Sequence, residues 1–154
     1  MLWIHLLMLS RKHYLYTQNK DMTSEVTYTG NLRTENTHQK SGAIYITDAP
    51  IDNNGKGEAF SPTDTVATGL ANCILTVMGI KSQQMKPEME GAKAEVIKTM
   101  ASNPRRISKI EINITMPSGF SKKEQKILEH TAHTCPVHYS LHPDIEKDVT
   151  IHWE

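Results

Sequence analysis

The sequence of 154 residues contains few cysteines and no excess of charge of either sign. Two cysteines are too few to hold together a small secreted domain, which relies on several disulfides. Lys and Arg together number 17, as do Asp and Glu, so the formal net charge is zero. Proteins that bind nucleic acid through counterion release normally carry a basic excess. The composition therefore argues against a disulfide scaffold and against a nucleic-acid partner.

A long hydrophobic run is also missing from the first residues. The apolar stretch over residues 1–9 is far shorter than the roughly 20 residues that span a bilayer. Its positive charges, Arg11 and Lys12, follow the apolar stretch, whereas a signal peptide carries them before it. We expect residues 1–21 to be an extension from an early start codon or a peripheral helix. We also expect a cytoplasmic protein without a membrane partner, and a single domain over residues 22–154.

The remaining sequence alternates between strand patterns and helix patterns. Hydrophobic residues make up 38% of the chain, which is enough for one packed core. Polar connections are expected over Glu35–Gly42 and Asp48–Gly57. Segments rich in β-branched residues, with partial alternation, predict five strands: Val26–Thr34, Ala43–Thr47, Ala92–Met100, Ile107–Met116 and Val149–Trp153.

Two helices are predicted between these strands. Ser61 and Pro62 form a strong helix start, and the pattern continues to about Met85. This helix is apolar on most sides, which is typical of a central, buried helix. Ser121 and Glu124 form a capping box that opens the second helix. The order of elements predicts an α+β domain of antiparallel strands with helices on one face.

The two cysteines fall on these two helices. Cys73 lies in the middle of the first, and Cys135 lies at the end of the second. Two interpretations are buried structural thiols and a pair that cycles through a disulfide, which requires Cα atoms within about 7 Å. A third interpretation is a zinc site, because histidines surround Cys135: His130, His133, His138 and His142. Pro136 interrupts the helix that would align such ligands, so we expect no metal.

The residues around each cysteine form a motif. The first is Ser-Pro-Thr-Asp-Thr-Val-Ala-Thr-Gly-Leu-Ala-Asn-Cys over residues 61–73. The second is Thr-Cys-Pro-Val-His-Tyr-Ser-Leu over residues 134–141. Together they resemble the two signature segments of the OsmC/Ohr family of thiol-dependent peroxidases, over about residues 25–153. The resemblance implies an intertwined homodimer in which antiparallel sheets wrap around two central helices, with active sites at the dimer interface.

The resemblance also implies a chemistry that needs no cofactor. Members of the family reduce hydroperoxides, often organic ones. Cys73 would attack the peroxide and become a sulfenic acid, and Cys135 would then form a disulfide with it. A dithiol reductant would restore both thiols. The alternative is a non-catalytic module of the same fold that binds a small apolar ligand or senses redox state.

A cation is needed to activate Cys73 as a thiolate. This residue lies three turns into its helix, whereas the helix dipole acts mainly within the first turn. The family uses an arginine from the early sheet, and Arg33 is the natural candidate here. The alternative for Arg33 is an exposed charge at a strand end. His38 is a weaker candidate, more typical of a loop residue.

One position departs from the family pattern. Many members have a glutamate directly after the helix proline, where it holds the arginine, and this chain has Thr63. Asp64 is expected to substitute, with Glu58 as another possible partner of the arginine. The alternative for Asp64 is stabilisation of the first helical turn without a catalytic duty. The match is therefore closer to a broader OsmC-like branch than to the branch dedicated to organic hydroperoxides.

Overall fold

The structure, a computed structural model, describes residues 22–85 and 88–154. The predicted extension over residues 1–21 lies outside the described residues. The chain divides into two compact units, one ending at Pro62 and the other running from Thr63 to Glu154. Each is described by itself. The prediction of a single domain over residues 22–154 stays a prediction.

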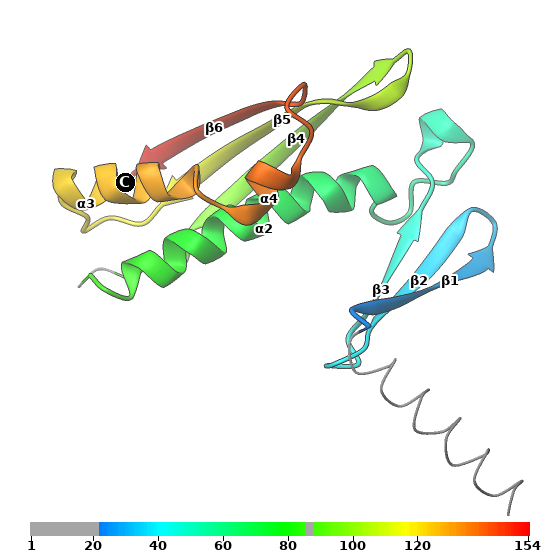
Figure 1. Ribbon diagram of the computed structural model, residues 1–154, viewed down its shortest axis with the longest axis horizontal. Coiled ribbons are helices and arrows are strands. Elements are labelled where there is room, and N and C mark those ends of the chain that lie inside the picture. The colour runs from blue at the N-terminus through cyan, green and yellow to red at the C-terminus, as the bar shows by residue number, and fades with distance from the viewer. Residues whose placement is uncertain (1–21, 86–87) are drawn as a thin grey trace, which may run out of the picture. The chain divides into compact units, whose positions relative to one another are not determined.

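The first unit is a three-stranded antiparallel sheet in the order β1-β2-β3 (Figure 1). Its strands are β1 (Ser24–Gly30), β2 (Arg33–His38) and β3 (Ile44–Asp48), and a short 3₁₀ helix, η1 (Ile51–Asn53), follows. The prediction of one strand over Val26–Thr34 is wrong, because the chain reverses between β1 and β2. Half of the expected connection over Glu35–Gly42, up to His38, is instead part of strand β2.

This reversal rests on residues with a left-handed backbone. Gly30, Asn31 and Leu32 have φ values of 89°, 51° and 62°. Glycine adopts such angles without strain and asparagine tolerates them, so Gly30-Asn31 is a turn signal in the sequence. The hydroxyl of Tyr28 accepts a hydrogen bond from the backbone N–H of Leu32 over 3.2 Å. A tight turn between Gly30 and Arg33 therefore divides the predicted strand into the hairpin of β1 and β2.

The second unit has a long helix, a three-stranded sheet and two shorter helices (Figure 1). In chain order its elements are α2 (Pro62–Ser82), β4 (Lys93–Ser102), β5 (Arg105–Met116), α3 (Lys122–Ala132), α4 (Pro136–Ser140) and β6 (Glu146–Trp153). The predicted start of α2 is confirmed, as is the capping box of α3, in which Ser121 and Glu124 exchange hydrogen bonds.

The strands of the second sheet lie in the order β4-β5-β6. Strands β4 and β5 are antiparallel, but β5 and β6 are parallel. The expectation of purely antiparallel strands is wrong for this pair. The chain crosses over through α3 and α4 between β5 and β6, so it enters β6 in the same direction as β5. The α+β fold class itself is confirmed.

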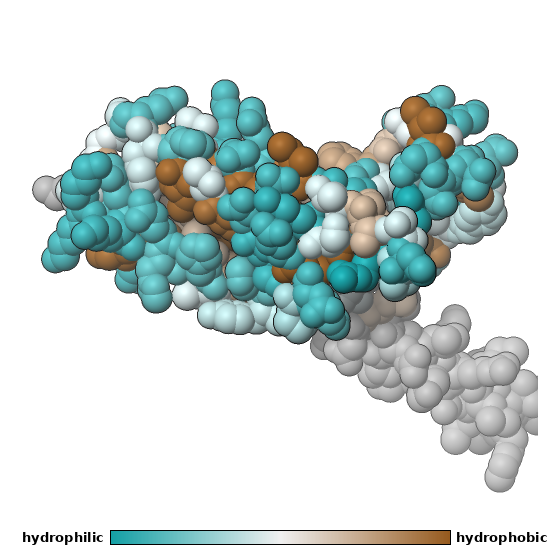
Figure 2. Space-filling model, turned by 90° about the horizontal axis from the view of Figure 1, so that it is seen from above, coloured by the Kyte–Doolittle hydropathy of each residue, from teal (hydrophilic) through white to brown (hydrophobic). Residues whose placement is uncertain are grey.

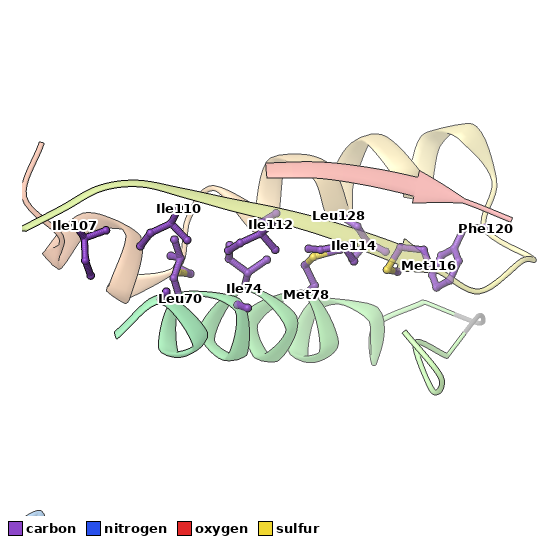
Figure 3. Close-up of a cluster of buried hydrophobic side chains, with 14 residues drawn as sticks. Leu70, Ile74, Met78, Ile107, Ile110, Ile112, Ile114, Met116, Phe120 and Leu128 are labelled. Atoms are coloured by element: carbon purple, nitrogen blue, oxygen red, sulfur yellow. The ribbon is translucent and has the colours of Figure 1, made fainter. Parts of the chain in front are cut away.

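The core of the second unit lies between α2 and β5 (Figure 3). Alternate residues of β5 point to α2, and Ile110, Ile112 and Ile114 are at most 1% exposed. From α2, Leu70, Ile74 and Met78 are fully buried at steps of four residues. Leu128 of α3 joins the same cluster.

Only one side of α2 is buried in the single chain. Val66 and Ile80 are 41% and 59% exposed, so the expectation of a helix buried on most sides is wrong for one chain. By length and hydropathy alone α2 could cross a membrane, a test that core helices of soluble proteins also pass. We interpret it as a core helix, because its buried side packs against β5.

Hydrophobic side chains also lie at the surface, among hydrophilic ones (Figure 2). In the first sheet, strand register places Val26, Tyr28 and Tyr45 on one face, and each is more than half exposed. Ile44 and Ile46 lie on the opposite face and are 60% and 46% exposed. Both faces of this sheet therefore carry apolar side chains that are exposed in the described part of the chain.

Candidate active site

The structure brings the two cysteines together within the second unit. Cys73 lies in the middle of α2 and is partly buried, whereas Cys135 lies between α3 and α4 and is fully buried. Both are free thiols. Cys73 packs against the buried cluster that contains Cys135. Burial, and after it a side-chain hydrogen bond and a charge interaction with Cys73, raise the pKa of Cys135. A residue from each predicted helix thus contributes to one thiol pair.

The surroundings of Cys135 favour its protonated form. Burial is the largest cause of its raised pKa, because the charged thiolate loses its hydration. The backbone N–H of His138 donates a hydrogen bond to Cys135 Sγ over 3.2 Å, which acts in the opposite direction. Cys135 is the N-cap of α4, and Pro136 occupies the first helical turn. The net result is a pKa above the ordinary value of a thiol.

The imidazole of His138, three residues after this thiol, has a lowered pKa, which favours its neutral form. Burial lowers the pKa of His138 most, and the charges of Lys147 and His133 lower it further. Its ring meets those of His133 and Tyr139 edge-on, with centroids 6.1 Å and 5.9 Å apart. Across residues 22–85 and 88–154, no group of three or more His, Cys, Asp or Glu side chains could hold a metal ion. The zinc interpretation of the histidines around Cys135 therefore gains no support.

Arg33 begins β2 in the first unit and binds two carboxylates. Its Nη2 lies 3.3 Å from Asp48 Oδ2 and also donates to Glu58 Oε2. The backbone N–H of Glu58 donates to the same Asp48 oxygen over 2.9 Å. These carboxylates raise the pKa of Arg33, with Asp48 the larger cause. The backbone N–H of Glu58, followed by the Arg33 guanidinium, lowers the pKa of Asp48, so this buried carboxylate is ionised.

Asp64 and Thr63 both contact a lysine. Lys98 Nζ, from β4, lies 2.7 Å from Asp64 Oδ1 and 2.7 Å from Thr63 Oγ1. This contact joins the first turn of α2 to the sheet of the second unit. The prediction that Asp64 orients Arg33 stays a prediction. His38, the weaker candidate, has its Nδ1 2.7 Å from Ser41 Oγ in the same hairpin.

Sequence reasoning missed Asp48 altogether. The sequence pattern predicts a polar connection from this residue onward, but Asp48 ends β3 and is completely buried. The strand register pairs it directly with Arg33. A signal was present, because an acidic residue directly after the alternating segment Ile-Tyr-Ile-Thr falls on a strand end. The predicted contact between Glu58 and Arg33 is present.

Both cysteine motifs lie within one segment of the chain that matches a known protein family. The family model described as OsmC-like protein matches residues 55–150. The chain belongs to the OsmC family. The family resemblance inferred from the two cysteine motifs is thereby confirmed, and the match includes both cysteines.

Solved structures of OsmC-like proteins agree with this membership. A Psychrobacter arcticus protein, named for osmotic stress induction and a detoxification response, is 54% identical, with a TM-score of 0.82. The match covers 85% of this chain and 96% of that one. An OsmC-like protein from Mycoplasma pneumoniae is 16% identical, with a TM-score of 0.70, over 86% of this chain and 98% of that one.

A more distant match extends the fold comparison. An organic hydroperoxide resistance protein from Elizabethkingia anophelis is 20% identical, with a TM-score of 0.64. The alignment covers 86% of this chain and 97% of that one, and it shows a shared fold. A search among curated proteins gave no significant match.

Proposed function

We propose that this OsmC-family protein is a cysteine-based peroxidase that reduces organic hydroperoxides. The observation that carries the proposal is the pairing of Cys73 and Cys135 within one unit. Membership of the family, and relatives of the same fold that are named organic hydroperoxide resistance proteins, support a peroxidase-like role. The reaction needs no metal, flavin or haem.

The unequal burial of the two thiols supports their order of action. The partly buried Cys73 is the thiol that a peroxide can reach. Its thiolate attacks the terminal oxygen of the hydroperoxide, the O–O bond breaks, and the alkoxide takes a proton and leaves as an alcohol. Cys73 is thereby oxidised by two electrons to a sulfenic acid.

The buried Cys135 then resolves this intermediate. Its sulfur bonds to Cys73 Sγ, and the sulfenic oxygen leaves as water with the proton of the Cys135 thiol. An external dithiol reduces the resulting disulfide by exchange and becomes a disulfide itself. The raised pKa of Cys135 suits this order, because a protonated thiol does not compete for the peroxide.

Arg33 is the cation that we assign to Cys73. Its guanidinium has five N–H donors, and both carboxylates bind through Nη2. The remaining N–H groups can stabilise a thiolate or hydrogen-bond the oxygens of a peroxide. In this proposal Asp48 and Glu58 perform the task of the family glutamate that Thr63 replaces.

The active protein is proposed to be a homodimer. Both faces of the first sheet expose apolar side chains, among them Val26, Tyr45 and Ile44. One side of α2 is exposed at Val66 and Ile80. A second copy that covers these surfaces would remove them from water, which is the dominant gain in obligate association.

Steady-state kinetics test the proposed activity. Purified protein is mixed with cumene hydroperoxide and dithiothreitol, and peroxide consumption is followed for the wild type, Cys73→Ser and Cys135→Ser. We expect turnover by the wild type, none by Cys73→Ser, and strongly impaired recycling in Cys135→Ser. Peroxide turnover by Cys73→Ser would refute the mechanism. A folded wild type that consumes no peroxide would favour the non-catalytic module instead.

A further inference from the structure

We propose that Asp48 is a positioning residue that fixes Arg33 for reaction, while Glu58 is its exchangeable partner. The inference rests on the proposed function, in which Arg33 acts on Cys73 and on the peroxide. Asp48 touches neither the substrate nor a cysteine in this account and acts only through Arg33.

The strand register holds Asp48 beside Arg33. The two residues are direct partners in the antiparallel ladder of β2 and β3, so their side chains emerge side by side on the same face. Both ends of this contact are therefore fixed by backbone pairing. Glu58 lies outside the strands, in the segment between η1 and α2, and has no such pairing.

Burial separates the two carboxylates further. The side chain of Asp48 is completely buried, whereas that of Glu58 is 57% exposed. An exposed carboxylate can exchange its partner for water at little cost, so exposed ion pairs contribute little to structure. A buried carboxylate that loses its partner remains as an uncompensated charge, which is strongly unfavourable. Asp48 therefore holds Arg33 more firmly than Glu58 does.

The hydrogen bonds around Asp48 keep it charged for this purpose. Its Oδ2 accepts from both Arg33 Nη2 and the backbone N–H of Glu58. Its Oδ1 and Arg33 Nε are buried without a hydrogen-bond partner among the residues that the structure describes. The contact between the two side chains thus uses one guanidinium nitrogen and leaves the Nε donor to other partners.

Arg33, Asp48 and Glu58 form a charged cluster, which also accounts for the threonine at position 63. The family glutamate would hold the arginine from the first turn of the long helix. In this chain Thr63 and Asp64 bind Lys98. Asp48 and Glu58 hold Arg33 from within its own unit.

Rapid kinetics of Cys73 oxidation test the assignment in the full chain. Stopped-flow mixing with cumene hydroperoxide gives the second-order rate constant, in a Cys135→Ser background that isolates the first step. We expect Asp48→Asn to lower this constant about 10- to 100-fold, the scale on which misplaced groups act. Glu58→Gln should lower it less than Asp48→Asn. The matched control is Glu35→Gln, an exposed carboxylate in β2 outside the cluster, which should leave it unchanged.

A double-mutant cycle shows whether Asp48 acts through Arg33. Arg33→Gln should be slow, and adding Asp48→Asn to it should slow it no further. The pH profile of Cys73 alkylation by iodoacetamide should move to higher pH in Asp48→Asn, a readout that a merely structural residue would not move. A further slowing of the double variant, or an unmoved alkylation profile, would overturn the positioning role.

The outcomes separate this inference from the proposed function. If Arg33→Gln oxidises at the wild-type rate, the role of Arg33 in the proposed function fails. If Arg33→Gln is slow but Asp48→Asn is fast, only the inference fails. Should Asp48→Asn not fold, Asp48→Glu keeps the buried charge and displaces the guanidinium. It should then slow oxidation more than Glu58→Asp does, and equal effects would contradict the inference.

Discussion

The backbone N–H of His138 donates a hydrogen bond to Cys135 Sγ over 3.2 Å, at the first turn of α4. The sulfur that the account assigns to disulfide formation is thus also the N-cap of a short helix. This sulfur can accept the hydrogen bond both as a thiol and as a thiolate. The start of α4 therefore helps to fix the position of this sulfur.

The role of Cys135 predicts a trapped intermediate. In Cys135→Ser, Cys73 should be oxidised once and should remain a sulfenic acid, because no second thiol is present to resolve it. Dimedone added after one equivalent of cumene hydroperoxide should then give a single adduct on Cys73 by mass spectrometry. The wild type, treated in the same way, should give little adduct. Equal labelling of both proteins would show that Cys135 is not the resolving thiol.

The raised pKa of Cys135 predicts a pH dependence of stability. A thiol whose pKa is higher in the folded state binds its proton more tightly there than in the unfolded state. This stabilisation is fully present below the unfolded pKa, about 8.5, and is lost as the pH rises through the higher folded pKa. The free energy of unfolding, measured by urea titration of the reduced proteins, should therefore fall over this alkaline range. It should fall further for the wild type than for Cys135→Ala. Parallel curves for the two proteins would contradict the raised pKa.

The core between α2 and β5 predicts unequal costs of truncation. Ile74 is fully buried against β5, and Ile74→Ala should lower the free energy of unfolding by about 2–5 kcal/mol. Ile97 is 53% exposed on the other face of the same sheet, so Ile97→Ala should cost about 0.5 kcal/mol. Denaturant titrations of both variants give the comparison. A similar loss in both would place the core elsewhere.

The proposed homodimer predicts that a charge placed on an apolar face of the first sheet will prevent dimerisation. Light scattering on the wild type should give the mass of two chains. Val26→Asp places a charge at an exposed apolar position and should produce monomers if a second copy covers this face. Glu25→Asp, at the neighbouring and oppositely directed position of β1, is the control and should leave the dimer intact. A monomeric wild type, or a Val26→Asp variant that stays dimeric, would remove this surface from the interface.

Local signals in the sequence predicted most elements well. The Ser-Pro start of α2 and the Ser121–Glu124 capping box act through nearby backbone groups, so a short stretch of sequence suffices to recognise them. The alternation of isoleucines in β5 likewise predicted its buried face. The hairpin between β1 and β2 could have been found from Gly30-Asn31, but the β-branched residues on either side favoured one longer strand.

Features that depend on pairing between distant segments were less accessible. The parallel register of β5 and β6 depends on the path of the chain through α3 and α4, which no short pattern encodes. The burial of Asp48 depends on its pairing with Arg33 and on the backbone of Glu58. The sequence could propose Arg33 and Glu58 from a family resemblance, but only strand register identifies Asp48 as their common partner.

The most direct test of the account is the product formed by one equivalent of peroxide. Reduced protein is treated with cumene hydroperoxide, alkylated without reductant, and examined by intact mass and by peptide mapping. The account predicts the loss of both thiols, no added oxygen, and a peptide that joins Cys73 to Cys135. Two thiols that remain alkylated in folded protein, or a stable oxygen on Cys73 with Cys135 still free, would contradict it.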